Sequence, residues 1–331
     1  MAPSATNLTL RFLAAPSDVS FGGTVHGGKI LEWIDKAGYA CAVGWSGSYC
    51  VTAYIGNVRF TRPVQIGQLV EVQARLIYTG RSSMHILLTV QSADPKTGVF
   101  VETTQCLSVF VAVNADGRPS SVNRWEPRTD EDRSLEQDAI RRIYLRQEIQ
   151  DEMASQTFSA ATQSREVALR FLAAPTDVNW GGKVHGGTVM RWIDEAAYVC
   201  AVSWSGQYCV AVYAGGVRFY EPVLIGNLVE VQARLLYTGR TSMHLAVHVR
   251  SSDLKTAQSI LTTECLLVFV ALDELRRPTP VRCWQPTSPE DRALEQHAIR
   301  LMELRGQRNG PESQKNNPGP DHGTDHPDCA G

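Results

Sequence analysis

The sequence predicts an α+β protein made of two copies of one domain, each a curled antiparallel sheet of about five strands wrapped round a central helix. Three observations lead to this prediction. The chain repeats itself once along most of its length. Each copy contains one helical segment that is apolar around most of its circumference, so other elements must surround it. Each copy then continues in strand-like runs separated by turn signals.

The internal repeat determines the domain organisation. Residues from Leu10 to Arg141 align without a gap with those from Leu169 to Arg300, and roughly three positions in five are identical. A chain of 331 residues is long enough for two domains of this size. We therefore assign residues 7–147 and 166–305 to two equivalent domains joined by a polar linker, residues 148–165.

The last segment, residues 306–331, has no apolar cluster, and we expect it to be disordered. His322, Asp325 and His326 lie close together there and could suggest a metal site. A solvated tail is the favoured interpretation of these three residues, so no metal site is predicted.

Composition excludes several classes of function. A net charge of −2 gives no basic surface for nucleic acid, and no apolar run is long enough for a membrane span. The first residues lack the pattern of a signal peptide. None of the eight cysteines forms a CxxC pair and most lie in apolar runs, which favours reduced, buried and inert thiols in a cytoplasmic protein.

The elements of the first copy follow in a simple order. A strand over residues 7–15 precedes a helix from Gly27 to about Val43. Four runs rich in Val, Thr and aromatic residues come next, over residues 50–60, 68–78, 83–92 and 101–113. A final helix over residues 131–148 is expected to pack outside the sheet.

One acidic residue in the central helix does not follow its polar stripe. Lys29, Glu32 and Lys36 form this stripe, and Asp35 lies about 60° away from it. In the second copy the charges at two stripe positions are reversed, whereas the acid is retained as Asp194. Asp35 is therefore either a solvated or Arg-paired helix residue or a functional carboxylate that acts as base or nucleophile.

A His-Gly-Gly triplet opens each central helix, as His26, Gly27 and Gly28 in the first copy and as His185, Gly186 and Gly187 in the second. The first amides of a helix are unpaired and favour negative charge, and glycine lets a ligand approach them closely. The alternative is structural: the glycines permit a tight entry turn, and the histidines cap or pack.

Together these segments resemble the acyl-CoA thioesterases of the hotdog fold, and more closely the tandem acyl-CoA hydrolases that join two hotdog domains in one chain. The shared motif has an Asn six residues before the His, then HGG, then an acid nine residues after the His. By this resemblance Asp35 and Asp194 are catalytic acids and Asn179 is the Asn of the second copy. The first copy departs from the motif, because Ser20 stands at that position. The resemblance also implies a homo-oligomer, a trimer of double hotdogs.

Helix geometry predicts how one site is assembled. Gly28 and Asp35 are seven residues apart, roughly 10 Å along a helix, so both cannot touch one thioester carbonyl. Each site must therefore combine two copies. The first would contain Asp35, Asn179 and the Gly187 amide; the second would contain Asp194, Ser20 and the Gly28 amide. Because Ser is a weaker orienting group than Asn, we expect the first site to carry most of the activity.

The predicted reaction is hydrolysis of an acyl-CoA, with the coenzyme as part of the substrate and no other cofactor. Two hairpins that follow a Gly offer an Arg and hydroxyls for the coenzyme phosphates; the alternative is a solvated surface turn. Their residues are Arg81, Ser82 and Ser83, and Arg240, Thr241 and Ser242. Other functions for the same fold are an acyl-CoA hydratase or dehydratase and a non-catalytic acyl-CoA sensor.

Overall fold

The computed structural model describes residues 6–56, 58–159 and 162–306. In the first half, strands β1 (Asn7–Leu13), β2 (Cys50–Ile55), β3 (Val58–Arg59), β4 (Leu69–Thr79), β5 (Ser83–Ala93) and β6 (Val101–Ala112) accompany helices α1 (Gly27–Ser46) and α2 (Asp130–Ala154). In the second half, β7 (Glu166–Leu172), β8 (Tyr208–Phe219), β9 (Leu228–Thr238), β10 (Ser242–Ser252) and β11 (Ser259–Leu272) accompany α3 (Gly186–Ser205) and α4 (Pro289–Gly306). Short 3₁₀ helices, η1 (Pro16–Asp18) and η2 (Pro175–Asp177), precede α1 and α3.

The strands of both halves form one continuous sheet. Their order is β1-β4-β5-β6-β2-β8-β11-β10-β9-β7, and the short β3 pairs with β8 beside this path. The halves join where β2 pairs antiparallel with β8, Tyr54 opposite Arg218 and Ile55 opposite Val217. Each half thus contributes five strands to the path, as the sequence predicts.

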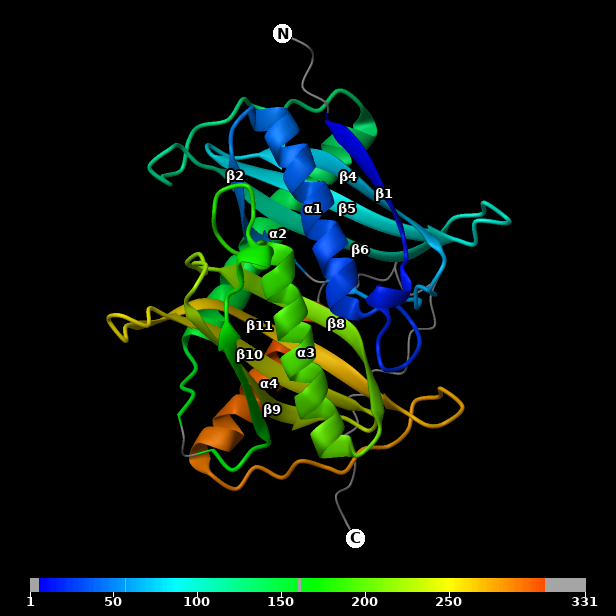
Figure 1. Cartoon of the computed structure of the whole chain (residues 1–331), viewed down its shortest axis with the longest axis vertical. Helices are drawn as coiled ribbons and strands as arrows, with labels where there is room; N and C mark the ends of the chain where they lie inside the picture. Colours follow the sequence, from blue (N-terminus) through cyan, green and yellow to red (C-terminus); the bar gives the residue numbers. More distant parts are fainter. Residues whose placement is uncertain (1–5, 57, 160–161, 307–331) are drawn as a thin grey trace.

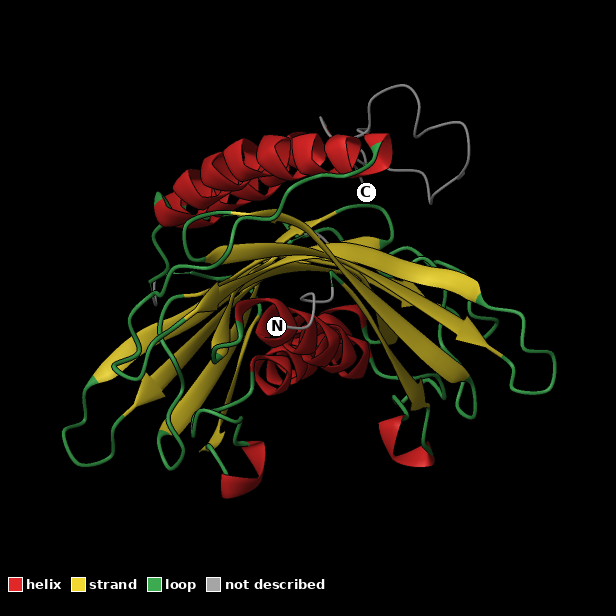
Figure 2. Ribbon diagram, turned by 90° about the horizontal axis from the view of Figure 1, so that it is seen from above, coloured by secondary structure: helices red, strands yellow, loops and turns green. Residues whose placement is uncertain are grey.

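The sheet curves around the two central helices. Figure 2 shows α1 and α3 side by side on the concave face, and α2 and α4 on the convex face. In Figure 1, α1 and α3 extend away from each other toward opposite ends of the molecule. The apolar side of α1 is buried against the sheet, through Ile30, Leu31, Trp33, Ile34, Ala37, Cys41 and Ala42. The expectation that about five strands of each half curl round a central helix, with a further helix outside, is therefore confirmed, and the two sets of strands join into one sheet.

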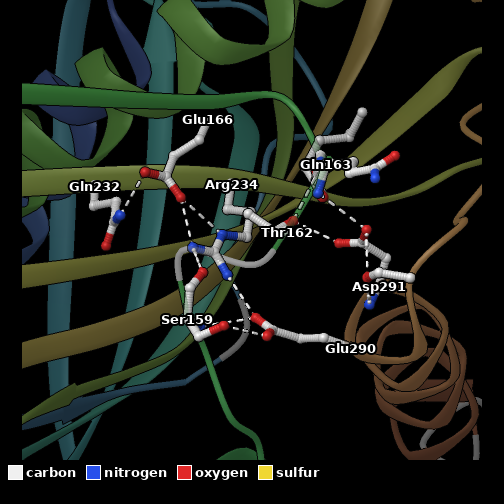
Figure 3. Close-up of polar contacts among 11 residues, drawn as sticks. Ser159, Thr162, Gln163, Glu166, Gln232, Arg234, Glu290 and Asp291 are labelled. Carbon is white, nitrogen blue, oxygen red and sulfur yellow. Dashed lines mark hydrogen bonds and ion pairs between the residues drawn. The ribbon is translucent and has the colours of Figure 1, made fainter.

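A polar cluster attaches the segment between the halves to the second half (Figure 3). Arg234 on β9 is almost fully buried, and its guanidinium bonds Glu166 at 2.6 Å and Glu290 at 3.2 Å. The same guanidinium donates to the Ser159 carbonyl at 2.8 Å. Helix α2 runs through Ala154, so the first part of the segment 148–165 is helical.

Six cysteines are free and buried, namely Cys41, Cys50, Cys106, Cys200, Cys209 and Cys265. Burial raises the pKa of Cys41, Cys106 and Cys200 to about 12, so these thiols are unreactive. For Cys283 the expectation of a buried thiol is wrong, because this residue is exposed. Cys329 and the tail residues from 307 onward, including His322, Asp325 and His326, lie outside the described residues.

Candidate active site

Asp35 is buried at the contact between the two halves, with 2% of its surface exposed. The backbone N–H of Gly187, at the start of α3, donates to Asp35 Oδ2 at 2.9 Å. The Thr52 hydroxyl on β2 donates to Oδ1 at 2.6 Å, and His185 Nδ1 lies 2.9 Å from Oδ2. Both structural alternatives for Asp35 are therefore wrong, because this carboxylate is buried and has no arginine partner among the residues that the structure describes.

The second half repeats this arrangement with one donor missing. Gly28 N–H donates to Asp194 Oδ2 at 2.8 Å, and His26 Nδ1 lies 2.9 Å from the same oxygen. The repeat places Ala211 where the first half has Thr52, so no hydroxyl reaches Asp194 from that position. Each carboxylate thus accepts a hydrogen bond from the other half, as the helix spacing predicts. Asp35 accepts a further hydrogen bond from Thr52, which Asp194 lacks at the equivalent position.

The two histidines of the triplets occupy the N-cap positions of α1 and α3. His26 Nδ1 lies 3.2 Å from Gly28 N and 2.9 Å from Asp194 Oδ2. Nδ1 accepts from the Gly28 N–H as the N-cap bond. When it is protonated it donates to Asp194 instead, because a carboxylate can only accept. Burial lowers the pKa of His26, but the hydrogen bond and charge of Asp194 outweigh burial and raise it above its ordinary value.

The two glycines of each triplet have different neighbours. A Cβ on Gly186 would lie 3.1 Å from Asp35 Oδ2, so a side chain at this position would crowd the carboxylate. A Cβ on Gly187 would lie only 2.7 Å from the Glu32 Cα, and one on Gly28 only 2.7 Å from the Arg191 Cα. The second glycine therefore permits the close backbone contact of α1 with α3 that brings each amide to the opposite carboxylate.

Asn179 and Ser20 lie in the loops that precede the central helices. Asn179 Oδ1 accepts from Gly181 N at 2.8 Å and from Lys183 N at 3.1 Å. Ser20 Oγ accepts from Gly22 N at 3.2 Å. Most of these bonds hold the loops themselves, but Ser20 Oγ also lies 3.5 Å from the Tyr208 hydroxyl on β8. No bond from Asn179 to Asp35 is among those of the described residues.

Aromatic residues that sequence reasoning missed line both sites. Trp180, directly after Asn179, stacks on Tyr39 with ring centroids 4.5 Å apart and lies edge-on to His185. The repeat gives Phe21 stacked on Tyr198 at the second site. A signal was present in the sequence: Tyr39 lies one helical turn after Asp35, so both face the same way. Thr52 was not predicted, because threonine is common in strands. Its one distinguishing signal in the sequence is that the second copy has Ala211 at the same position.

The predicted coenzyme-binding residues lie at the turns between β4 and β5 and between β9 and β10. Arg81 is exposed in the β4–β5 hairpin, and Arg240 is exposed in the β9–β10 hairpin. Ser82, Ser83, Thr241 and Ser242 are half-buried beside them. No contact of these residues with the carboxylates is among those of the described chain, so their role stays a prediction.

The chain belongs to the thioesterase superfamily, whose family model matches residues 22–99 and 181–258. Its double-hotdog architecture and paired carboxylates agree with that assignment. A cytosolic acyl coenzyme A thioester hydrolase of Mus musculus is 24% identical over 92% of this chain and 84% of its own length. An uncharacterized acyl-CoA thioester hydrolase of Zymomonas mobilis is 35% identical over 40% of this chain and 87% of its own length.

Two solved structures are similar to this chain to different extents. An apo-hexameric acyl-CoA thioesterase is 32% identical, covers 46% of this chain and 97% of its own, and has a TM-score of 0.43. A Lactobacillus plantarum protein assigned provisionally as an oleoyl thioesterase is 11% identical, covers 82% and 99%, and has a TM-score of 0.58. The latter likeness extends across both halves and concerns the fold alone.

Within the described chain no helix is long and apolar enough to cross a membrane.

Proposed function

We propose that this chain hydrolyses acyl-CoA thioesters to free acid and CoA, mainly at the site around Asp35. The observation that carries the proposal is the buried Asp35 carboxylate, bound by Thr52 of its own half and by Gly187 and His185 of the other. The relatives named above are acyl-CoA thioester hydrolases, which supports the same reaction class.

The chemistry follows from these donors. A thioester carbonyl is already activated, and thiolate leaves readily, so the mechanism needs neither a metal nor a cofactor. Asp35 either activates a water molecule or attacks the carbonyl to form a mixed anhydride that water opens. The Gly187 amide stabilises the oxyanion. In the structure the Gly187 N–H donates to Asp35. When substrate binds, the carbonyl oxygen of the acyl group either shares this N–H with Asp35 or replaces Asp35 as its acceptor. In our proposal the carbonyl approaches Asp35 beside Gly186, where a side chain would crowd the carboxylate.

Two differences favour the first site over the second. Thr52 restrains the Asp35 carboxylate, whereas Ala211 leaves Asp194 without that bond. Asn179, in our proposal, turns its amide to water or to the thioester when substrate binds, and Ser20 offers only a short rotating hydroxyl. Each lost hydrogen bond costs about 1 kcal/mol, and more where it acts only in the transition state.

The test compares the two carboxylates. Asp35→Ala should lower kcat by orders of magnitude, whereas Asp194→Ala should change it little. Thiol release from a panel of acyl-CoAs measures the rate, and circular dichroism with CoA binding confirms folding. Equal losses for the two variants would show equivalent sites, and a larger loss for Asp194→Ala would contradict the assignment.

The alternative functions give different results in the same experiment. A hydratase would consume crotonyl-CoA, seen as absorbance loss, without releasing thiol. A non-catalytic sensor would bind acyl-CoA without turnover. Either outcome would overturn the proposal.

Three finer points belong to the proposal. Arg81 with Ser82 and Ser83, and Arg240 with Thr241 and Ser242, bind the coenzyme phosphates from the hairpins. The protein works in the cytoplasm, in keeping with the cytosolic mammalian relative. It forms a homo-oligomer, a trimer of double hotdogs.

A further inference from the structure

Arg276 has a backbone conformation that arginine seldom adopts. It lies in the hairpin after β11 with φ +63°, and the repeat places Gly117 at the same position with φ +75°. The two turns are alike, because Gly117 N–H donates to Asn114 O at 2.9 Å and Arg276 N–H donates to Asp273 O at 3.0 Å. A non-glycine residue in this region is strained, because its Cβ crowds the backbone.

The Arg276 side chain connects the second half to the loop of the second site. Its guanidinium carbon lies 4.5 Å from the Tyr208 ring centroid, and Nη2 donates to the Gly22 carbonyl at 2.5 Å. The Tyr208 hydroxyl in turn lies 3.5 Å from Ser20 Oγ. The first site lacks this connection, because Gly117 has no side chain.

Backbone strain alone does not single out Arg276. Ala257 has φ +55° in another hairpin, where the repeat has Gly98. Ala257 is exposed and its methyl group offers no polar contact. Arg276 is therefore distinguished by its side-chain contacts with Tyr208 and Gly22. Ala257 is a matched control for the effect of backbone strain alone.

The Arg276 contacts compensate for a weaker set of hydrogen bonds within the loop that contains Ser20. In the first site, Asn179 Oδ1 accepts two loop N–H groups, from Gly181 and Lys183. In the second site, Ser20 Oγ accepts one, from Gly22. Arg276 restrains the same loop from outside at the Gly22 carbonyl.

We propose that Arg276 is a positioning residue that holds the second site in a ligand-binding shape, so that this site binds coenzyme A or its thioesters while hydrolysing them poorly. Compared with the first site, the second has Ser20 in place of Asn179 and Ala211 in place of Thr52, and it has in addition an arginine that keeps its loop in place. That combination fits binding better than hydrolysis. The inference rests on the proposed function.

Calorimetric titration of the full chain with CoA, the product that is not turned over, tests the proposal. The unaltered protein should bind two CoA molecules per chain. Arg276→Gly, which relieves the backbone, should weaken one binding event at least tenfold and leave the other intact. Ala257→Gly relieves the same kind of strain elsewhere and should change neither. Ser20→Asn combined with Arg276→Gly should restore the lost event.

Three outcomes would overturn the inference. These are one CoA per chain in the unaltered protein, two unchanged events in Arg276→Gly, and equal weakening of both events, which would indicate an effect on the whole fold. Absence of both thiol release and CoA binding in the unaltered protein would instead refute the proposed function.

Discussion

At the level of single residues, the two carboxylates differ less in themselves than in what surrounds them. Asp35 and Asp194 are both buried and both bound by the opposite helix terminus. The differences are Thr52 against Ala211 on the strands and Asn179 against Ser20 in the loops. Activity should therefore be transferable to the second site by changing these neighbours.

Ser20→Asn with Ala211→Thr, introduced into the Asp35→Ala chain, should restore hydrolysis at the second site. Two recovered hydrogen bonds are worth about 1–3 kcal/mol in the transition state, or roughly ten- to a hundredfold in kcat. Thiol release compares the triple variant with Asp35→Ala alone. Adding Asp194→Ala must abolish the gain, and a gain that survives this change would contradict the mechanism.

A second residue-scale prediction concerns acid stability. His85 on β5 is 2% exposed, and burial, followed by the charge of Arg146, lowers its pKa to about 3. The unfolded chain takes up this proton near pH 6.5, so the stability contributed by neutral His85 is complete above pH 6.5 and is lost as the pH falls toward 3. At pH 4.5 the loss amounts to about 2–3 kcal/mol.

His85→Phe should remove this part of the acid sensitivity, because phenylalanine keeps the edge-on contact with Tyr78 and cannot take up a proton. Urea unfolding at pH 7 and pH 4.5 measures the difference. If both proteins lose the same unfolding free energy between these values, the buried histidine is not the cause.

At the level of elements, the close contact of α1 with α3 depends on glycine. Gly28→Ala places a methyl carbon 2.7 Å from the Arg191 Cα, so the helices must separate. We expect a loss of about 1–3 kcal/mol of stability and a weakened Gly28–Asp194 hydrogen bond. Gly44→Ala is the matched control in the same helix: nothing lies within 4 Å of its added carbon, and it should stabilise by about 0.5–1 kcal/mol. Equal effects of the two changes in thermal unfolding would refute the close-contact explanation.

At the level of the whole molecule, the concave side below α1 and α3 is open in Figure 2, and the sheet ends in strands β1 and β7. Both halves repeat exposed apolar residues beside these strands, namely Leu13, Val19, Phe21, Leu172, Val178 and Trp180. Such a surface favours association, and we expect a trimer of chains. Light scattering at micromolar concentration should give three times the mass of one chain, and a monomer would contradict the expectation.

The internal repeat and the hydrophobic periodicity predict the fold, because each strand and helix carries its own pattern and the second copy confirms the first. Helix spacing likewise predicts that a carboxylate of one half meets an amide of the other. The contact of Thr52 with Asp35 could not be predicted, since it depends on where β2 passes α1 in space. The hydrogen bond from Arg276 to the Gly22 carbonyl could not be predicted either, because the two residues come together only when both halves have folded against each other.

The pairing of β2 with β8 joins the two halves through one strand edge of each. If the halves were separate polypeptides, each could pair with itself through the same strand edge. A pair of first halves would offer Asp35 and Thr52 twice, but always with Ser20. A pair of second halves would offer Asn179 twice, but always with Asp194 and Ala211. Only the mixed pair contains Asp35, Thr52 and Asn179 in one site, and a single polypeptide guarantees that every molecule is the mixed pair.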